Sequence, residues 1–266
     1  MHISPELAFT LTLILRMAVT AAFVITASII TERSGPVIGA LVATLPISAG
    51  PSYVFLALDH DAAFIAQGAL ASLPINAATI FLGLTYVLLA QRHNVIVSFG
   101  AAVMVWLALA VLVRMTEWSL AGGIVANVIA FGICLPLMRR FRHAKMPVIT
   151  RRWYDIPLRA ALVATLVGIV VTLSHTIGPA ASGTIALYPV VLTSLILALH
   201  PRIGGVPTAA VIANGGWGLM GFGLSIVVLH LAATRLGSAI SLSLALATCV
   251  AWNLGLWSWG RRRIAR

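Results

Sequence analysis

The chain has 266 residues, of which 61% are hydrophobic and 9% charged, and its mean hydropathy is +1.05. A soluble globular protein carries about 25% charged residues, so this composition excludes that class and indicates an integral membrane protein. A formal net charge of +11 would suggest nucleic acid as the partner of a soluble protein. Here the basic residues fall between apolar segments, where membrane topology explains them, and no nucleic-acid partner is expected.

Nine segments are apolar enough to cross a bilayer, which takes ~20 mostly apolar residues. We predict spans at 8–30, 36–57, 63–90, 95–113, 119–138, 157–174, 179–199, 206–234 and 238–259. Pro74 interrupts the third span, and Asn214-Gly215-Gly216 lies inside the eighth. The sequence therefore predicts an all-α integral membrane protein of about nine transmembrane helices.

The distribution of basic residues predicts how these spans are oriented. When the spans alternate sides, fourteen of the 17 Lys and Arg residues fall on the face that holds the carboxyl end. Basic residues accumulate on the cytoplasmic side of membrane proteins. We therefore expect a multi-pass protein of the cytoplasmic (inner) membrane, with its N-terminus outside and its C-terminus in the cytoplasm.

A proline-containing segment occurs twice in the chain. GPVIGALVATLP, from Gly35 to Pro46, returns 143 residues later as GPAASGTIALYP, from Gly178 to Pro189. The same offset relates Arg16 to Arg159 and Arg92 to Arg235. This register without gaps predicts an internal duplication.

The duplication divides the chain into three parts. The first repeat is 1–116 with spans 1–4, the linker span 5 and the basic cytoplasmic loop are 117–156, and the second repeat is 157–266 with spans 6–9. Because five spans precede the second repeat, the two repeats are expected to be inverted relative to one another. Inverted repeats are typical of secondary transporters, which bind substrate between them near the bilayer midplane.

Spans 2, 3, 7 and 8 contain the most polar residues and helix breakers. Such residues are tolerated at membrane depth where they are buried in protein or line a wet cavity. We predict a midplane binding site formed by Thr44, Pro46, Ser48, Ser52, Tyr53, Asn76, Thr184, Tyr188, Pro189, Thr193, Asn214 and Trp217. The alternative is that these small and polar residues only pack helices together, and that Asn76 and Asn214 join helices rather than bind a solute.

Two arginines complete the predicted site. Arg16 lies inside the first span, and Arg235 ends the eighth on the same side of the predicted topology. Buried charge in a membrane is usually functional, so Arg16 and Arg235 could share an anion. The alternative for Arg16 is a side chain that extends to the headgroups.

Signatures of enzymes and metal sites are missing from the sequence. It has no H-E-x-x-H, Walker A or G-x-S-x-G motif, and no carboxylate lies deep in a span. Cys134 and Cys249 lie in apolar runs and indicate neither a disulfide nor a metal site. We therefore expect no enzymatic activity, catalytic residues, cofactor or metal, and no carboxylate proton relay.

The second repeat resembles a family of small membrane proteins. The residues that carry the likeness are Arg159, then GPAASGTIALYPVVLTSLILALH, then Trp217 in a long span that ends at Arg235, then SLSLALATCVAW. This order resembles the GlpM-like inner-membrane proteins, and Gly183, Pro189 and His200 match their motif. The resemblance implies that one repeat can exist alone as a dimer, and that this chain is the fused form.

The leading hypothesis is a secondary-type transporter that moves a small solute or amphiphile, with an anionic group favoured, through a site between the repeats. The alternative is a non-transporting membrane protein that binds lipid or a protein partner through its basic cytoplasmic loop. The expected partners are the substrate and membrane lipids, with a homodimer as a further candidate.

Overall fold

The computed structural model describes residues 4–33, 46–144 and 152–264, and in these ranges it contains α-helices and no strand. This confirms the predicted all-α class. The helices are α1 (Pro5–Arg33), α3 (Ala49–Asp59), α4 (Ala62–Leu89), α5 (Val95–Arg114), α6 (Leu120–Arg139), α7 (Asp155–Ala186), α8 (Val190–Ile203), α9 (Gly205–Leu236) and α10 (Ser238–Ile264).

Seven helices in the described ranges are long and apolar enough to cross a bilayer, so the chain is a multi-span membrane protein. The two shorter helices are α3, with 11 residues, and α8, with 14. They occupy the later parts of the predicted spans 36–57 and 179–199. Most of the earlier part of span 36–57, residues 36–45, lies outside the described residues.

The predicted span 179–199 is not one continuous helix. The backbone of Gly178 has φ 75°, a left-handed value that glycine adopts without strain, and the chain bends there before Pro179. The helix resumes, ends at Ala186, and α8 starts only after Pro189. This predicted span therefore consists of two helical pieces with a break between them.

The predicted interruption at Pro74 is wrong. Helix α4 continues through Pro74, and α9 continues through Asn214-Gly215-Gly216. A proline removes one helical hydrogen bond, and a membrane helix tolerates the loss when neighbouring helices surround it. Pro74 is buried within α4, which is the most enclosed of the long helices.

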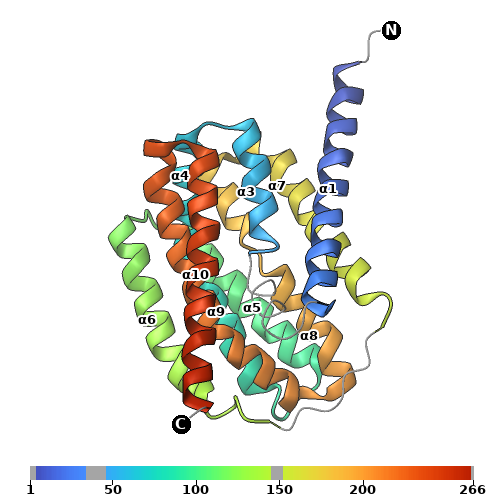
Figure 1. Ribbon diagram of the computed structural model, residues 1–266, viewed down its shortest axis with the longest axis vertical. Helices are drawn as coiled ribbons and strands as arrows, with labels where there is room; N and C mark the ends of the chain where they lie inside the picture. Colours follow the sequence, from blue (N-terminus) through green and yellow to red (C-terminus); the bar gives the residue numbers. More distant parts are fainter. Residues whose placement is uncertain (1–3, 34–45, 145–151, 265–266) are drawn as a thin grey trace.

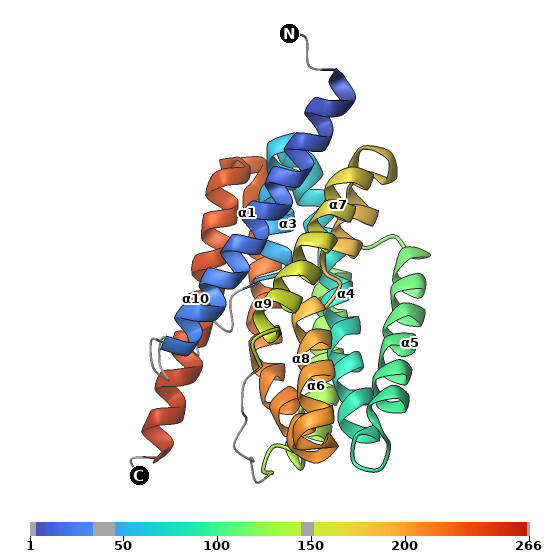
Figure 2. The same ribbon diagram turned by 90° about the vertical axis from the view of Figure 1, so that its right-hand side faces the viewer.

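Helix α4 forms the centre of the molecule. It packs against α5, α6, α7 and α9, and 78% of its most apolar 18-residue window is buried. By contrast, α1 lies at the side of the bundle and extends beyond it (Figure 1). Helix α1 begins at one end of the long axis and α10 ends at the other, and Figure 2 shows α5 on the side of the bundle away from α1 and α10.

In two pairs of packed helices, α4 with α9 and α1 with α7, the two partners run in opposite directions. In the first, Ala66 of α4 lies near His230 of α9, Asn76 lies near Leu219, and Gly83 lies near Ile212. In the second, Met17 of α1 packs on Gly168 of α7, while Phe9 and His175 line one small cavity. Residue numbers fall along one helix of each pair as they rise along the other, so both pairs are antiparallel.

Candidate functional site

A cavity with a volume of about 430 Å³ lies between α1, α3, α9 and α10. We call it the lateral cavity. Its lining residues are Val19, Thr20, Phe23, Pro46, Ala49, Gly50, Pro51, Tyr53, Val54, Phe55, Phe222, Ser225, Ile226, Leu229, Leu242, Ser243, Ala245 and Leu246. Small-molecule sites have volumes of ~300–1,000 Å³, so this cavity is large enough for a ligand.

Of the predicted site residues that the structure describes, Pro46 and Tyr53 line the lateral cavity and the others do not. Pro46 precedes α3, and its carbonyl accepts a hydrogen bond from the amide of Gly50 at 2.7 Å. Proline has no backbone N–H, and an N–H at the start of a helix would have no helical partner. Proline is therefore well tolerated just before α3. Thr44 lies outside the described residues, and Pro189 is a buried residue that directly precedes α8 in the second half of the chain.

Sequence reasoning missed the walls that α1 and α10 provide. Val19, Phe23 and Leu246 are exposed to between 45% and 52%, and the structure places them around the opening. Positions that face lipid and positions that line an apolar cavity are occupied by the same types of apolar residue, so the local sequence does not distinguish them. The only available signal was Gly50-Pro51 next to Pro46, which marks the α3 wall.

Tyr53 also belongs to a buried hydrogen-bond chain below the cavity wall. The Ser72 hydroxyl donates to the carbonyl of Gly183 at 2.9 Å and lies 2.7 Å from the Tyr53 hydroxyl. Because the single proton of Ser72 is committed to Gly183, Tyr53 must be the donor to Ser72. This chain joins α3, α4 and α7, and it leaves the Tyr53 ring facing the cavity.

Helices α4 and α7 touch through their backbones beside this chain. A Cβ atom built on Gly183 would lie 2.2 Å from the carbonyl oxygen of Gly68, and one built on Gly68 would lie 3.3 Å from the carbonyl oxygen of Pro179. Only glycine permits such an approach. The second copy of the repeated motif, GPAASGTIALYP, therefore packs directly on the central helix.

Asn76 is committed to helix packing. Its Nδ2 donates to Asn127 Oδ1 at 2.9 Å and to the carbonyl of Leu219 at 3.2 Å. Asn127 in turn donates to the carbonyls of Leu73 at 2.7 Å and Gly123 at 2.9 Å. The two amides join α4, α6 and α9, which is the alternative to solute binding considered for Asn76.

Asn214 lies elsewhere, at the end of the molecule where α6 ends. Its side chain is exposed and donates to the carbonyl of Arg142 at 3.2 Å. The Arg142 guanidinium lies 5.7 Å from the centre of the Trp217 ring, and the Trp217 carbonyl accepts a hydrogen bond from Trp252 at 2.9 Å. These contacts of Asn214 and Trp217 are with residues other than Asn76.

Most of the remaining predicted hydroxyls bond to their own helices. Ser52 donates to the carbonyl of Ser48, Thr184 to that of Ala180 and Thr193 to that of Val190. Tyr188 packs edge-on against Trp106, with 5.3 Å between ring centres. None of these side chains lines the lateral cavity.

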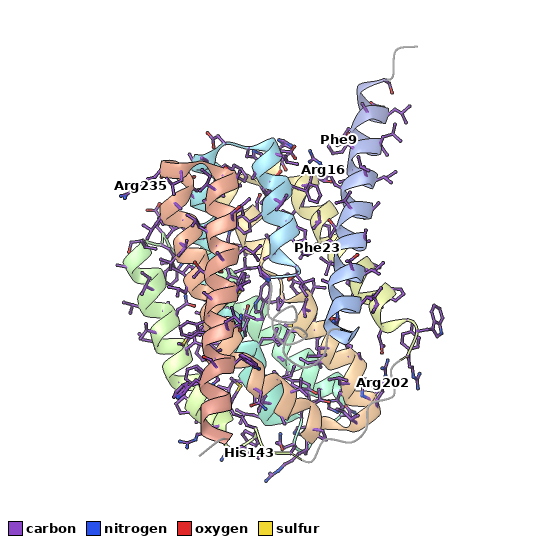
Figure 3. All side chains as sticks on the ribbon, in the orientation of Figure 1. Phe9, Arg16, Phe23, His143, Arg202 and Arg235 are labelled. Carbon is purple, nitrogen blue, oxygen red and sulfur yellow. The ribbon has the colours of Figure 1, made fainter. Side chains whose placement is uncertain are left out.

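Arg16 and Arg235 are not brought together. They lie on opposite sides of the end where α1 begins, as Figure 3 shows. Arg16 forms a bidentate ion pair with Asp59 at the end of α3, and one of its two hydrogen bonds measures 2.7 Å. Arg235 is exposed near the end of α9.

Next to Arg16 is a second cavity of about 230 Å³, which we call the polar cavity. It is lined by Ala8, Phe9, Thr12, Leu13, Arg16, Asp59, Val171 and His175. The hydrogen bonds from Arg16 lower the pKa of Asp59, and burial lowers the pKa of His60, whose ring is 4.7 Å from that of His175. At neutral pH this site therefore carries one fixed ion pair and neutral histidine at position 60.

The structure offers no metal site among the residues that it describes, because no three His, Cys, Asp or Glu side chains gather in these ranges. The apolar lateral cavity and the ion pair next to it are therefore the features on which a functional hypothesis can be based.

Replacing Asn76 by leucine should cost about 1–3 kcal/mol of unfolding free energy, because Asn127 would lose a partner inside the membrane. The leucine would also meet Gly223, where an added Cβ would already lie 2.8 Å from Asn76 Nδ2. Asn214→Leu is the matched control and should change stability by less than about 0.5 kcal/mol, because Asn214 is exposed. Thermal unfolding in detergent measures both; equal losses would contradict the different roles given to these amides.

No known protein family, characterised protein or solved structure matches the chain.

Proposed function

We propose that the chain is a secondary-type membrane transporter built from two inverted repeats. The first support is a shared helix plan. Helix α4 begins at Ala62 and α9 at Gly205, while α5 begins at Val95 and α10 at Ser238. Each pair of starting residues is 143 positions apart, which is the offset of the sequence repeat.

The second support is the way equivalent helices pack on one another. Asn76 and Leu219, which are in contact, are 143 residues apart and so occupy equivalent positions in the two repeats. A contact between equivalent residues lies on the axis that relates the repeats. Because α4 and α9 are antiparallel, that axis runs across the helices, as it does in inverted-repeat transporters. Helices α1 and α7 pack in the same way.

The third support is an ion pair that joins the first long helix to the short helix in each half of the chain. Arg16 of α1 binds Asp59 at the end of α3, and Asp155 of α7 binds Arg202 near the end of α8, with one oxygen–nitrogen distance of 2.6 Å. Positions 59 and 202 are 143 residues apart. On the long helices the partners differ in position, because Asp155 corresponds to Thr12, one turn before Arg16. Each repeat thus ties its first long helix to its short helix, with the acid and the base on opposite helices.

The observation that carries a transport function is the difference between two equivalent seams. The seam between α3 and α10 borders the lateral cavity. The equivalent seam, between α8 and α5, is filled by Trp106, which is 4% exposed, donates to Thr79 at 3.1 Å and packs on Tyr188. Two inverted repeats with one seam open and the other filled can exchange these states, which would expose a site to each side in turn.

This exchange can be tested without knowing the cargo. Val54→His and Leu246→His would allow Zn²⁺ to close the first seam, in a background with Cys134 and Cys249 replaced by alanine. Spin labels on cysteines at Leu197 and Val103, the equivalent positions, would report the second seam. We expect two separations between the labels, and Zn²⁺ should increase the population of the longer one.

The matched control is the same labelled protein without the two histidines, in which Zn²⁺ should change nothing. A single separation that Zn²⁺ does not affect in the histidine variant would refute alternating access. The chain would then be better described by the second candidate function, a membrane protein that binds anionic lipid at its basic end.

One observation favours that second candidate. Arg142, after α6, has buried Nε and Nη2 atoms without a hydrogen-bond partner in the described part of the chain. Burial and the neighbouring Arg139 lower its pKa. A guanidinium with unused donors next to Arg139 and Arg140 is suited to a phosphate headgroup. Vesicle binding that depends on anionic lipid and is lost in Arg142→Gln would support this function.

A further inference from the structure

We propose that the ligand of the lateral cavity is a single-chain amphiphile, a hydrocarbon chain that ends in a hydrogen-bond-accepting group such as a carboxylate. This proposal rests on the transport function above and names the class of its cargo. It differs from the expectation of a polar midplane site, because the lateral cavity is apolar and the polar groups lie beyond one end of it.

The lateral cavity offers a ligand almost no hydrogen bonds. Its hydroxyls already donate to carbonyls of their own helices, Thr20 to Arg16 at 2.8 Å, Ser225 to Phe222 at 2.7 Å and Ser243 to Ala239 at 3.0 Å. No charged side chain is among its lining residues in the described part of the chain. An ion or sugar would lose its hydration here without replacement, whereas a hydrocarbon chain would lose nothing.

The opening of the lateral cavity faces the region that lipid would occupy. Val19, Phe23, Val54 and Leu246 line it and are each about half exposed, with values from 45% to 52%. All four are apolar residues of apolar helices. A molecule that is already dissolved in the bilayer could therefore reach the cavity from the side.

The polar cavity follows the lateral cavity along two helices. On α1, Phe9, Thr12 and Arg16 line the polar cavity, and Val19, Thr20 and Phe23 line the lateral one. On α3 the order is the same, because Asp59 belongs to the polar cavity and Phe55, one turn earlier, to the lateral cavity. Figure 3 shows Phe9, Arg16 and Phe23 in this order down α1.

Arg16 lies at the junction between the two cavities. Its guanidinium is 5.7 Å from the centre of the Phe55 ring, which lines the lateral cavity. A guanidinium has five N–H donors, and Asp59 receives hydrogen bonds from two of its nitrogens. The remaining donors can bind an acceptor. A polar end group at Arg16 would therefore place the attached chain in the lateral cavity.

Hydrocarbon burial alone would not hold such a ligand, because lipid tails are as apolar as the cavity wall. Selection must come from the polar end group at Arg16 and from the shape of the cavity. Palmitic acid should therefore compete for the site much better than hexadecane, which has the same length of chain and no acceptor.

Photolabelling of the full chain in phosphatidylcholine vesicles tests the proposal. The probe is a palmitic acid analogue with a diazirine at mid-chain, and labelled peptides are identified by mass spectrometry. We expect saturable labelling on α1, α9 and α10 that palmitic acid suppresses at least about tenfold better than hexadecane, equivalent to ~1.4 kcal/mol.

Two matched variants separate the cavity from the general lipid surface. Ala245→Trp would fill part of the lateral cavity, and it should reduce the saturable labelling by about tenfold or more. Ala108→Trp adds the same indole on the exposed face of α5 and should leave the labelling unchanged. Both variants should have the elution profile and unfolding temperature of the parent protein, which shows that they are folded.

The proposal is overturned if labelling rises linearly with probe concentration and is as strong on α5 as on α1, α9 and α10. It is also overturned if Ala245→Trp does not reduce the labelling, or if hexadecane competes as well as palmitic acid. These results leave the transport proposal intact, because the spin-label experiment needs no ligand. Saturable labelling together with a single separation between the spin labels would instead show a chain that binds amphiphiles without transporting them.

Discussion

Gly183→Ala should leave little stably folded protein, with a loss of at least about 3 kcal/mol of unfolding free energy. The new methyl group would lie 2.2 Å from the carbonyl oxygen of Gly68 and 2.8 Å from its carbonyl carbon. Overpacked sites usually cost ~1–3 kcal/mol, and this one lies at the upper end because the obstacle is backbone that no rotamer change can move. Separating α4 from α7 would also break the bond from Ser72 to Gly183.

Gly215→Ala is the matched control, because nothing lies within 4 Å of a Cβ built at Gly215 and the residue is in a helix. It should be neutral or stabilising by up to about 1 kcal/mol, since alanine favours helix over glycine. Yield after detergent extraction and the midpoint of thermal unfolding measure both variants. Gly183→Ala with the stability of the parent protein would mean that α4 and α7 do not touch in this way.

Reversing the charge at Arg16 should also be strongly destabilising. Arg16→Asp would place a second carboxylate against Asp59 in a site where both native side chains are 16% exposed. Exposed ion pairs contribute ~0–1 kcal/mol, and a broken buried pair costs ~3–5 kcal/mol, so we expect a loss of about 2–3 kcal/mol for this partly buried pair.

The double variant Arg16→Asp with Asp59→Arg should recover most of that loss. It restores opposite charges and gives α1 and α3 the polarity already present between α7 and α8, where Asp155 lies on the long helix and Arg202 on the short one. The unfolding midpoints of the parent, both single variants and the double variant give the coupling energy directly. A double variant as unstable as Arg16→Asp would show that the ion pair is not the source of the effect.

The sequence was sufficient to predict the class of fold and most helix boundaries. Spans such as 95–113 and 238–259 agree with α5 and α10, because a long apolar run between polar loops forms a membrane-spanning helix. Pro74 misled the prediction, because a proline inside a helix and one at a break have the same local sequence. Whether the helix continues depends on the neighbours that satisfy its backbone.

The candidate site was harder to predict, for a physical reason. The search for polar residues at membrane depth found Asn76, which holds helices together, and missed Phe23 and Leu246, which line the lateral cavity. A polar side chain inside a membrane needs a partner whether or not a ligand is present. An apolar cavity wall is made by the arrangement of helices, and no single residue indicates it.

If the chain consists of two inverted repeats, as proposed, the opposite polarity of the two ion pairs gives a route by which a duplicated membrane protein acquires a fixed orientation. An ion pair between a long helix and a short one survives when its two charges change places, whereas the charge near the adjoining loop changes sign. In this chain Asp59 of the short helix α3 binds Arg16, which lies toward one end of the molecule, and Arg202 lies toward the opposite end (Figure 3). Since arginine near a loop favours the cytoplasmic side, an ancestor that inserted in both directions could give rise to two halves committed to opposite directions, while each long helix stayed tied to its short one throughout.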